Sequence, residues 1–403
     1  MRILHVLAWM DPKMGGVSQA VKSIITGLKR HGIENEIVSL DGTDLKLDES
    51  FGQFIATGPG STPWFYSSKL SSWLMLNLCR FDIVILHGLW LYHSYALRKA
   101  VFLLKAANQK SVDKKKPVPL IYTMPHGMLD PYFQQSKTRK LKAIRNWFYW
   151  KIIEHKIIKD SSGLLFTSLE ERKLAATTFT PYLPNKEFVV GLGIETPPYR
   201  NEDMTKAFYT LCPEVAGKSY LLFLGRIDEK KGIDLLLNAY LDVQKKNEEL
   251  PEDERYNFPD LVIAGPGSES KYGQGMKSLA IKSKANIHFP GMLSGISKWG
   301  ALYNCDAFAL TSHQENFGIA IVEALACGKP VLISNKVNIW SEISETESGF
   351  VSDNTLTAIK DMLWYWLSLN NKEKKVIGEN GFKTFNRSYS IDNFSKNLIN
   401  VLK

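Results

Sequence analysis

Two glutamates in the second half of the chain stand eight residues apart, in a stretch that suits a polyhydroxylated ligand. Glu315 and Glu323 lie within residues 312–323, which read Ser-His-Gln-Glu-Asn-Phe-Gly-Ile-Ala-Ile-Val-Glu. An apolar run at 307–310, typical of a buried strand, precedes the stretch, and Ala-rich helical sequence follows it. The first carboxylate is thus expected on a loop and the second about two turns into a helix. The helix start adds backbone N–H donors, those of Asn316, Phe317 and Gly318.

A second group of side chains suits a phosphate ligand, and it follows the apolar run at 220–224. Arg226 and Lys231 stand in segment 225–232, which has the form Gly-Arg-x5-Gly. A planar guanidinium can bridge two phosphate oxygens, whereas an ammonium supplies a mobile point charge. Two cations that flank a helix start at the end of a strand predict a diphosphate site. Of the two adjacent lysines, we expect Lys230 to be the solvated one.

The spacing of the two glutamates resembles the E-x7-E signature of the retaining glycosyltransferases of family 4, which have the GT-B fold. The likeness extends over most of the chain and includes the Gly-Arg-x5-Gly segment. It implies that Glu323 accepts hydrogen bonds from the ribose hydroxyls, whereas Glu315 and the N–H groups of residues 316–318 hold sugar hydroxyls. It also implies that Arg226 and Lys231 hold the donor's pyrophosphate and stabilise the departing nucleoside diphosphate.

Two glycines near the N-terminus form a second candidate contact to phosphate. Gly15 and Gly16 follow the first predicted strand and open a helical pattern at 18–30. Glycine lets backbone N–H groups approach a phosphate closely, and a helix start adds positive potential. The pattern is not G-x-G-x-x-G, so dinucleotide binding is not indicated. The family resemblance places these glycines under the donor phosphates and the acceptor.

Two histidines also follow predicted strands of the first half. His126 stands in Pro-His-Gly after a strand that ends at residue 123, and His87 closes the strand before it. Neutral imidazole both donates and accepts hydrogen bonds, which suits a hydroxyl. The resemblance implies that His126 contacts the transferred sugar, often at its C6 oxygen. His87 is a candidate to line the same cleft because it closes the preceding strand. The resemblance also makes Gly265, which ends a strand of the second half, a candidate for the pocket of the base.

The elements that must position these residues alternate between strands and helices. Nearly continuous apolar strands separated by helices indicate an α/β protein with parallel sheets covered on both faces, and two such halves make two doubly wound, Rossmann-like domains. Helical patterns are clearest at 18–30 and 141–158. The strand candidates are residues 3–7, 36–40, 83–86, 118–123, 163–167, 188–190, 220–224, 261–264, 287–289, 307–310 and 331–333.

The alternating pattern is interrupted at 196–218 by prolines and a polar run. We therefore expect an N-terminal domain over residues 1–195 and a C-terminal domain over 196–387. By resemblance to the GT-B fold, the first binds the acceptor, the second binds the nucleotide-sugar donor, and a last helix at about 388–403 crosses back to the first. Ligands bind outside the carboxyl ends of strands in such sheets, so we expect the site in a cleft between facing domains.

Composition sets further limits on function. A chain of 403 residues is too long for one ordinary core, and no apolar run approaches the ~18 residues of a membrane span. The four cysteines form no C-x-x-C pair, which predicts neither a zinc site nor disulfides and favours the cytoplasm. A net charge of +9 could indicate binding to nucleic acid. The sequence has no RNA-binding or helix-turn-helix pattern, however, so nucleic acid is not expected as a partner. No D-x-D triplet occurs, which favours metal-independent chemistry without a cofactor.

Residues 137–159 are strongly basic and contain the aromatic run Trp-Phe-Tyr-Trp at 147–150. Cations spaced along one arc of a helix, together with interfacial aromatics, can bind an anionic membrane surface. An amphipathic helix whose apolar side is core would show the same pattern, and the sequence does not separate these alternatives. The cations on one arc are Lys142, Arg145, Lys156 and Lys159.

Together these features predict transfer of a hexosyl unit with retention, with His126, Glu315, Arg226 and Lys231 as the catalytic residues. By the family resemblance, UDP-hexose, such as UDP-glucose, is the first expectation for the donor and GDP-mannose the next. The expected acceptor is a glycan or a lipid-linked saccharide in bacterial exopolysaccharide or surface polysaccharide synthesis. The enzyme would work in the cytoplasm, with peripheral binding to the inner face of the membrane. The alternatives are a sugar-nucleotide epimerase of the same fold and a non-catalytic sugar-nucleotide binding subunit.

Overall fold

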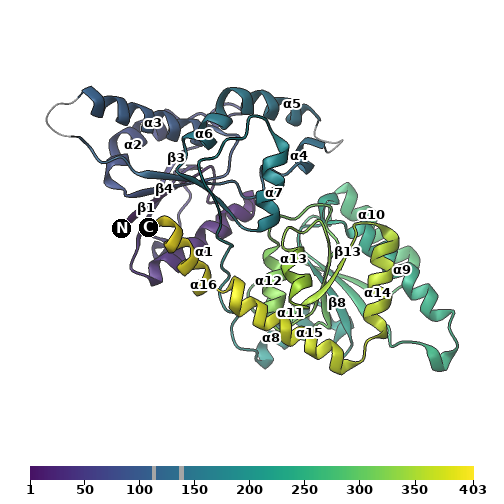
Figure 1. Cartoon of the computed structure of the whole chain (residues 1–403). Helices are drawn as coiled ribbons and strands as arrows, with labels where there is room; N and C mark the ends of the chain where they lie inside the picture. Colours follow the sequence, from purple (N-terminus) through teal and green to yellow (C-terminus); the bar gives the residue numbers. More distant parts are fainter. Residues whose placement is uncertain (111–114, 136–139) are drawn as a thin grey trace. The chain divides into compact units, whose positions relative to one another are not determined.

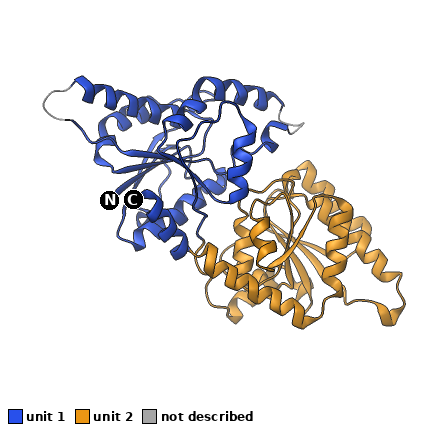
Figure 2. Ribbon diagram, viewed as in Figure 1, with its two compact units in different colours: residues 1–193, 391–403 blue, residues 194–390 orange. Residues whose placement is uncertain are grey.

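The protein consists of two compact units, each built on one parallel sheet (Figures 1 and 2). A computed structural model describes residues 1–110, 115–135 and 140–403. Unit 1 comprises Met1–Gly193 and Ile391–Lys403, and unit 2 comprises Ile194–Ser390. Helices alternate with the strands in both units, which confirms the predicted pair of doubly wound α/β domains.

Seven parallel strands form the sheet of unit 1, in the order β3-β2-β1-β4-β5-β6-β7. Neighbouring strands are aligned so that His87, at the end of β4, pairs with Leu7 of β1 on one side and with Met124 of β5 on the other. The strands are β1 (Arg2–Leu7), β2 (Glu34–Gly42), β3 (Gln53–Gly58), β4 (Ile83–His87), β5 (Leu120–Met124), β6 (Gly163–Phe166) and β7 (Glu187–Val189).

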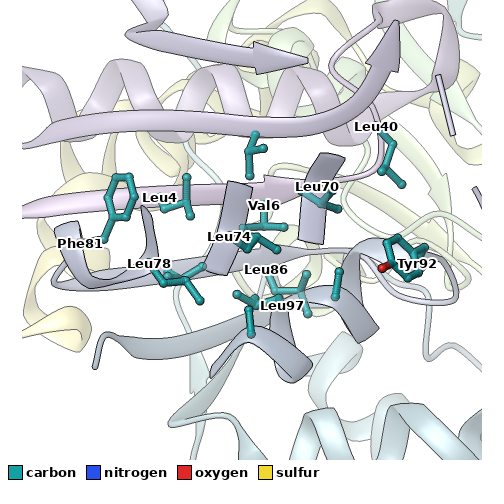
Figure 3. Close-up of a cluster of buried hydrophobic side chains, with 14 of the residues drawn as sticks. Leu4, Val6, Leu40, Leu70, Leu74, Leu78, Phe81, Leu86, Tyr92 and Leu97 are labelled. Carbon is teal, nitrogen blue, oxygen red and sulfur yellow. The ribbon is translucent and has the colours of Figure 1, made fainter. Parts of the chain in front are cut away.

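Helices cover both faces of this sheet, because successive side chains of each strand point to opposite faces. On one face, Leu4 and Val6 of β1 belong to a buried cluster with Leu74 of α2 and Leu97 of α3 (Figure 3). Each such fully buried leucine contributes about 1.5–3 kcal/mol. The helices are α1 (Gly16–Arg30), α2 (Ser68–Asn77), α3 (Tyr92–Lys110), α4 (Tyr132–Gln135), α5 (Lys140–Tyr149), α6 (His155–Asp160), α7 (Leu169–Thr178) and α16 (Ile391–Leu402).

The opposite face of the sheet is covered by α1. Leu7 of β1 and Ile37 of β2 pack with Val21 and Ile25 of this helix. The C-terminal helix α16 lies against α1, where a Cβ on Gly27 would overlap the Ser395 hydroxyl. The end of the chain therefore lies beside α1, and the carbonyl of Val401 in α16 accepts a hydrogen bond of 3.2 Å from the Tyr122 hydroxyl of β5.

The predicted helix at 141–158 is one helical run with a change of pitch in the middle. Residues Trp150–Glu154 form a π-helical turn between α5 and α6. This turn directs Trp150 and Glu154 into the interior, where both are fully buried. The π-helical turn thus separates the exposed helix α5 from α6, in which Ile157 and Ile158 are buried.

The sheet of unit 2 has six parallel strands in the order β10-β9-β8-β11-β12-β13. Its strands are β8 (Tyr220–Leu224), β9 (Asp260–Ala264), β10 (Ile287–Gly291), β11 (Ala307–Leu310), β12 (Val331–Ser334) and β13 (Gly349–Ser352). The helices are α8 (Glu202–Leu211), α9 (Ile233–Glu248), α10 (Lys271–Ser283), α11 (Gly295–Asn304), α12 (Ile319–Ala326), α13 (Trp340–Glu345), α14 (Leu356–Ser368) and α15 (Asn371–Thr384). Among the described residues, no helix is both long enough and apolar enough to cross a membrane.

Candidate functional site

The order of the strands reverses at one point in each sheet. In unit 2 the chain runs from β8 outward to β9 and β10, then returns to the other side of β8 to form β11, β12 and β13. The chain therefore continues from the neighbouring strands β8 and β11 in opposite directions along the sheet, and ligands of doubly wound sheets bind at such a switch point. In unit 1 the equivalent point lies between β1 and β4.

Arg226 leaves the carboxyl end of β8 with its side chain in solvent. The side chain is 69% exposed, and its Nη2 lies 3.5 Å from the Oδ2 of Asp228. Exposed ion pairs of this kind contribute only about 0–1 kcal/mol. The guanidinium can therefore turn toward an incoming anion at little energetic cost.

Gly265 supports the loop that carries Arg226. The backbone of Gly265 has a φ of 146°, and a Cβ at this position would overlap the carbonyl oxygen of Gly225. The next residue of the same turn, Pro266, accepts a hydrogen bond of 2.8 Å from the N–H of Ile227. The loop after β9 thus packs directly against the loop after β8, and only glycine fits at the point of closest approach.

Lys231 and Glu315 form an ion pair across the switch point of unit 2. The side chains are 17% and 14% exposed, and the ammonium donates to the Glu315 carboxylate. Two backbone contacts bring the loops together. A Cβ on Gly232 would overlap the carbonyl oxygen of Thr311, and the Thr311 hydroxyl donates to the Gly232 carbonyl over 2.8 Å. The residue predicted to bind the diphosphate, Lys231, is therefore in direct contact with the residue predicted to bind the sugar, Glu315.

Burial alone would raise the pKa of the Glu315 carboxyl, but its neighbours outweigh burial. The ammonium groups of Lys231 and Lys230 and the N–H of Gly318 hold that pKa below its usual value. Glu315 is therefore a carboxylate at neutral pH. The expectation that Lys230 is solvated is wrong, because Lys230 is half-buried and burial lowers the pKa of its ammonium in spite of Glu315.

The segment after Glu315 is the start of α12, and only part of it can face a ligand. The ring of Phe317 is buried and packs edge-on against Tyr389, so Phe317 can offer a ligand only its backbone. Gly318 is the N-cap of α12 with a φ of 76°, a left-handed conformation that favours glycine. The Asn316 side-chain oxygen accepts a hydrogen bond of 3.3 Å from Asn338.

Glu323 has a partner that the sequence does not reveal. Its carboxylate lies 2.7 Å from the Nζ of Lys298 on α11, and its side chain is 13% exposed. The same ammonium lies 4.0 Å from the centre of the Trp299 ring. A carboxylate has about four lone-pair positions, so this pairing orients Glu323 and still leaves acceptor capacity for hydroxyls.

His313 is a second residue of this loop that pattern reasoning missed, although it lies two positions before Glu315. Its Nδ1 is 2.6 Å from Asn354 Oδ1, and its Nε2 is 3.7 Å from Asp234 Oδ1. The Asp234 carboxylate, facing the ring, raises the pKa of His313. The imidazole of His313 thus links the loop after β11 to Asp234 in the first turn of α9.

In unit 1, Gly15 and Gly16 form the start of α1. Gly15 is the N-cap with a φ of 132°, and its carbonyl accepts a hydrogen bond of 3.0 Å from the Ser18 hydroxyl. A Cβ on either glycine would meet no atom within 4 Å. The two glycines therefore leave space above the helix start, as a phosphate contact requires.

His87 and His126 are brought into contact at the carboxyl edge of the same sheet. His87 Nδ1 lies 3.0 Å from His126 Nε2, and His87 Nε2 lies 2.9 Å from Nδ1 of a third histidine, His5. His87 and His5 are buried, whereas His126 is half-buried. Burial lowers the pKa of His5 and of His126 to about 4, so both rings are neutral at neutral pH.

The basic-aromatic stretch divides into exposed and buried parts. Lys137, where it begins, lies outside the described residues. Trp150 is buried and stacks on Phe179. By contrast, Trp147 and Phe148 are 50% and 56% exposed. Because Asn146 alone among the residues of α5 is buried, the alternative in which the apolar side of this helix is core is wrong for α5.

Comparison with known proteins identifies the family. The description "Glycosyltransferase Family 4" matches residues 14–186, and the description "Glycosyl transferases group 1" matches residues 213–384. An uncharacterized glycosyltransferase of Methanocaldococcus jannaschii is 24% identical over 425 residues, which cover 99% of this chain and 97% of that protein. A D-inositol 3-phosphate glycosyltransferase of Frankia alni is 26% identical over 203 residues, which cover 49% of this chain and 48% of that protein.

Solved structures share the fold over the whole chain. HepE of Anabaena in complex with UDP and glucose has a TM-score of 0.72 at 15% identity, covering 100% of this chain and 99% of that one. A glycosyltransferase from Rickettsia africae has a TM-score of 0.72 at 18% identity, covering 100% and 97%. The chain therefore belongs to the glycosyltransferases of family 4, a retaining family of GT-B fold that uses nucleotide sugars.

Proposed function

We propose that the chain moves a hexosyl unit from a nucleoside diphosphate sugar to a glycan or lipid-linked saccharide, in the synthesis of a bacterial exopolysaccharide or surface polysaccharide. The observation that carries this proposal is the contact between Lys231 and Glu315 at the switch point of unit 2, with Arg226 exposed on the same loop as Lys231. Cations for a diphosphate and a carboxylate for sugar hydroxyls then stand side by side.

The ion pair does not prevent ligand binding by either partner. An ammonium has three donors and a carboxylate about four lone-pair positions. Lys231 can therefore donate to a phosphate oxygen while it still holds Glu315, and Glu315 can accept from a sugar hydroxyl. As the bond to the sugar breaks, charge grows on the departing diphosphate, and Lys231 and Arg226 stabilise that charge without a divalent metal ion.

The remaining donor contacts come from the start of α12 and from Glu323. The N–H groups of Asn316–Gly318 and the Glu315 carboxylate hold the sugar, while Glu323, oriented by Lys298, accepts from the ribose hydroxyls. We assign to unit 1 the contacts of Gly15 and Gly16 with phosphate and acceptor and of His126 with the sugar, and to Gly265 a place beside the base. UDP-hexose, such as UDP-glucose, is the proposed donor, because HepE of the same fold is described with UDP and glucose; GDP-mannose is the second candidate.

A surface of unit 1 supports a lipid-linked acceptor and peripheral binding to an anionic membrane at the cytoplasmic side. Five large apolar side chains of α5 and the following turn are at least 50% exposed: Leu141, Ile144, Trp147, Phe148 and Ile152. Lys151 lies beside them, with its Nζ 5.6 Å from the centre of the Trp147 ring. Apolar side chains that enter the interface and cations that remain at anionic headgroups are the pattern of an interfacial helix.

A cavity of about 690 Å³ lies beside this surface in unit 1. Its volume is within the range of roughly 300–1,000 Å³ that is typical of ligand pockets. The cavity is lined by Trp64, Tyr66, Tyr92 and Tyr95, by three serines, by Ile152 and Ile153, and by the cations Arg98, Lys99 and Lys156. Aromatic rings and cations together suit an anionic, partly apolar ligand such as a lipid-linked saccharide phosphate.

The test is release of nucleotide from a panel of nucleoside diphosphate sugars, each with and without a saccharide acceptor. We expect release from a UDP-hexose that depends on the acceptor, and a product whose anomeric configuration is that of the donor. Release without acceptor, together with a changed sugar nucleotide, would instead identify an epimerase. Binding of nucleotide sugar without turnover for any acceptor would identify a binding subunit.

A further inference from the structure

A line of hydrogen-bonded side chains crosses unit 1 from β2 to the loop after β5. Asn35 Oδ1 lies 3.0 Å from His5 Nε2, His5 Nδ1 lies 2.9 Å from His87 Nε2, and His87 Nδ1 lies 3.0 Å from His126 Nε2. We call these four residues the histidine chain. Its members come from β2, β1, the end of β4 and the loop after β5, so the chain runs across the strands toward the carboxyl edge.

The histidine chain lies on the sheet face that α1 covers. His5 alternates with Val6 and shares a face with Leu7, which packs against α1. The facing ring nitrogens stand at hydrogen-bond distance, so each gap holds a proton and not a metal ion. In the part of the chain that the structure describes, no group of three His, Cys, Asp or Glu side chains could hold a metal. Burial lowers the pKa of the three imidazoles, and each is neutral.

The amide of Asn35 sets the direction of every hydrogen bond in the chain. A carbonyl oxygen can only accept, so the amide nitrogen of Asn35, Nδ2, must face the Ile33 carbonyl, to which it donates over 2.8 Å. The amide oxygen, Oδ1, therefore faces His5. His5 therefore donates from Nε2, and because the ring is neutral its Nδ1 can only accept. By the same rule His87 donates from Nε2 and accepts at Nδ1, and His126 donates from Nε2.

We propose that the histidine chain holds His126 in the tautomer protonated at Nε2, so that its Nδ1 accepts a hydrogen bond from a hydroxyl of the transferred sugar. Asn35, His5 and His87 are then positioning residues that act through His126. The contact with the sugar rests on the proposed function, whereas the tautomer does not. A free imidazole could present either nitrogen as donor or acceptor, but this ring can only accept, which selects sugars with a hydroxyl at that point.

The backbone around His126 is fixed as firmly as its ring. His126 has a φ of 53°, an uncommon conformation for a residue with a Cβ, and Gly127 follows with a φ of 76°. The N–H of Gly127 donates to the buried Glu171 over 2.6 Å, and the same carboxylate accepts from the N–H of Thr167 over 2.7 Å. Strain of this kind persists only where surrounding contacts hold it, and it gathers at functional sites.

The tautomer is measured by two-bond ¹⁵N–¹H correlation spectra of the full-length protein labelled at histidine, which distinguish the protonated ring nitrogen from the bare one. We expect the Nε2–H form of His126 in the wild type. His87→Gln should keep it, because the amide can donate to His5 and accept from His126. His87→Leu removes the acceptor and should give a mixture of both forms. The Nδ1–H form in the wild type, or an unchanged spectrum of His126 in His87→Leu, would overturn the proposal.

Kinetics provides the second readout, with His93 as the matched control. His93 is buried like His87, but its ring is not part of the histidine chain. Its Nε2 lies 3.1 Å from the His87 carbonyl oxygen. We expect His87→Leu to lower kcat/KM by roughly two- to tenfold, the effect of one neutral hydrogen bond, with unchanged binding of UDP alone. His87→Gln should recover most of the activity, and His93→Gln should leave the His126 tautomer as it is. Should no transfer be found in the wild type, the proposed function fails, while the tautomer spectra still decide this inference.

Discussion

Replacing Lys231 with methionine would leave the Glu315 carboxylate buried without its closest cation. Glu315 cannot withdraw, because its backbone is held on both sides: its N–H donates to Lys336 O over 2.8 Å, and its carbonyl accepts from Asn338 N over 2.9 Å. Breaking a buried ion pair costs about 3–5 kcal/mol, and the remaining exposure of 17% and 14% reduces this to about 2–3 kcal/mol.

Substitution of the other partner, Glu315, and the double variant complete a double-mutant cycle for this ion pair. Glu315→Gln leaves an ammonium on a flexible stem that can move toward water, so we expect a loss of about 1 kcal/mol. The double variant Lys231→Met with Glu315→Gln removes both charges of the pair, and its loss of stability should be no more than about 1 kcal/mol. The coupling free energy, which is the sum of the two single losses minus the loss of the double variant, is then about 2–4 kcal/mol.

The pH dependence of the cycle has a defined sign. In the wild type the folded-state pKa of Glu315 is lowered, so its contribution to stability is present above the unfolded pKa of about 4.5 and is lost as the pH falls. In Lys231→Met burial dominates and the pKa rises, partly opposed by Lys230, so stability is lost as the pH increases. The difference in the free energy of unfolding between the wild type and Lys231→Met should therefore be large at pH 7.5 and small at pH 5.

The assay is urea unfolding of all four proteins at both pH values. Because each unit has its own core, the free energy is taken from the transition that the substitutions move. Single losses that add up in the double variant to within about 0.5 kcal/mol would refute the coupling. An equal loss at both pH values would refute its electrostatic origin.

Three further predictions concern other parts of the chain. Glu154 is fully buried, and burial raises its pKa to about 7, so it costs stability as the pH rises from about 4.5 to 7; Glu154→Gln should gain about 3 kcal/mol over the wild type at pH 8 and little at pH 4, measured by unfolding at both. Gly265→Ala should push the loop after β9 from Gly225, lower stability by about 1–3 kcal/mol and weaken UDP binding, seen in melting curves with and without UDP; unchanged curves would contradict the contact. The double variant Trp147→Ser with Phe148→Ser should leave the melting temperature in place, because both rings are exposed, and reduce sedimentation with vesicles that contain anionic lipid; equal sedimentation with neutral vesicles or by the double variant would remove the membrane proposal.

Strands at the centre of each sheet are predictable from sequence because both of their faces are buried. The predicted runs at 220–224 and 307–310 coincide with β8 (Tyr220–Leu224) and β11 (Ala307–Leu310), whose residues are nearly all buried. By contrast, β3 (Gln53–Gly58) and β13 (Gly349–Ser352) were not predicted. Both are edge strands with half-buried residues and terminal glycine, so they lack the continuous apolar run.

Within the site, the sequence identifies residue types but not their partners. The contact of Lys231 with Glu315 joins residues 84 positions apart, and Lys298 reaches Glu323 from another helix. Neither separation corresponds to a helix or strand period, so no local pattern could reveal these pairs. The solvated assignment of Lys230 failed for the same reason, since the loop after β11 covers it and its carbonyl accepts from His313 N over 2.8 Å.

In the proposed function, the cations of the loop after β8 hold the diphosphate of the donor. Titration calorimetry of UDP with the wild type and Arg226→Ala tests it directly, because the 69% exposed side chain can be removed without disturbing the fold. We predict binding weaker by roughly 10- to 150-fold, the range of one charge-assisted hydrogen bond lost. UDP binding of equal strength in a folded Arg226→Ala protein would exclude Arg226 as a ligand of the diphosphate.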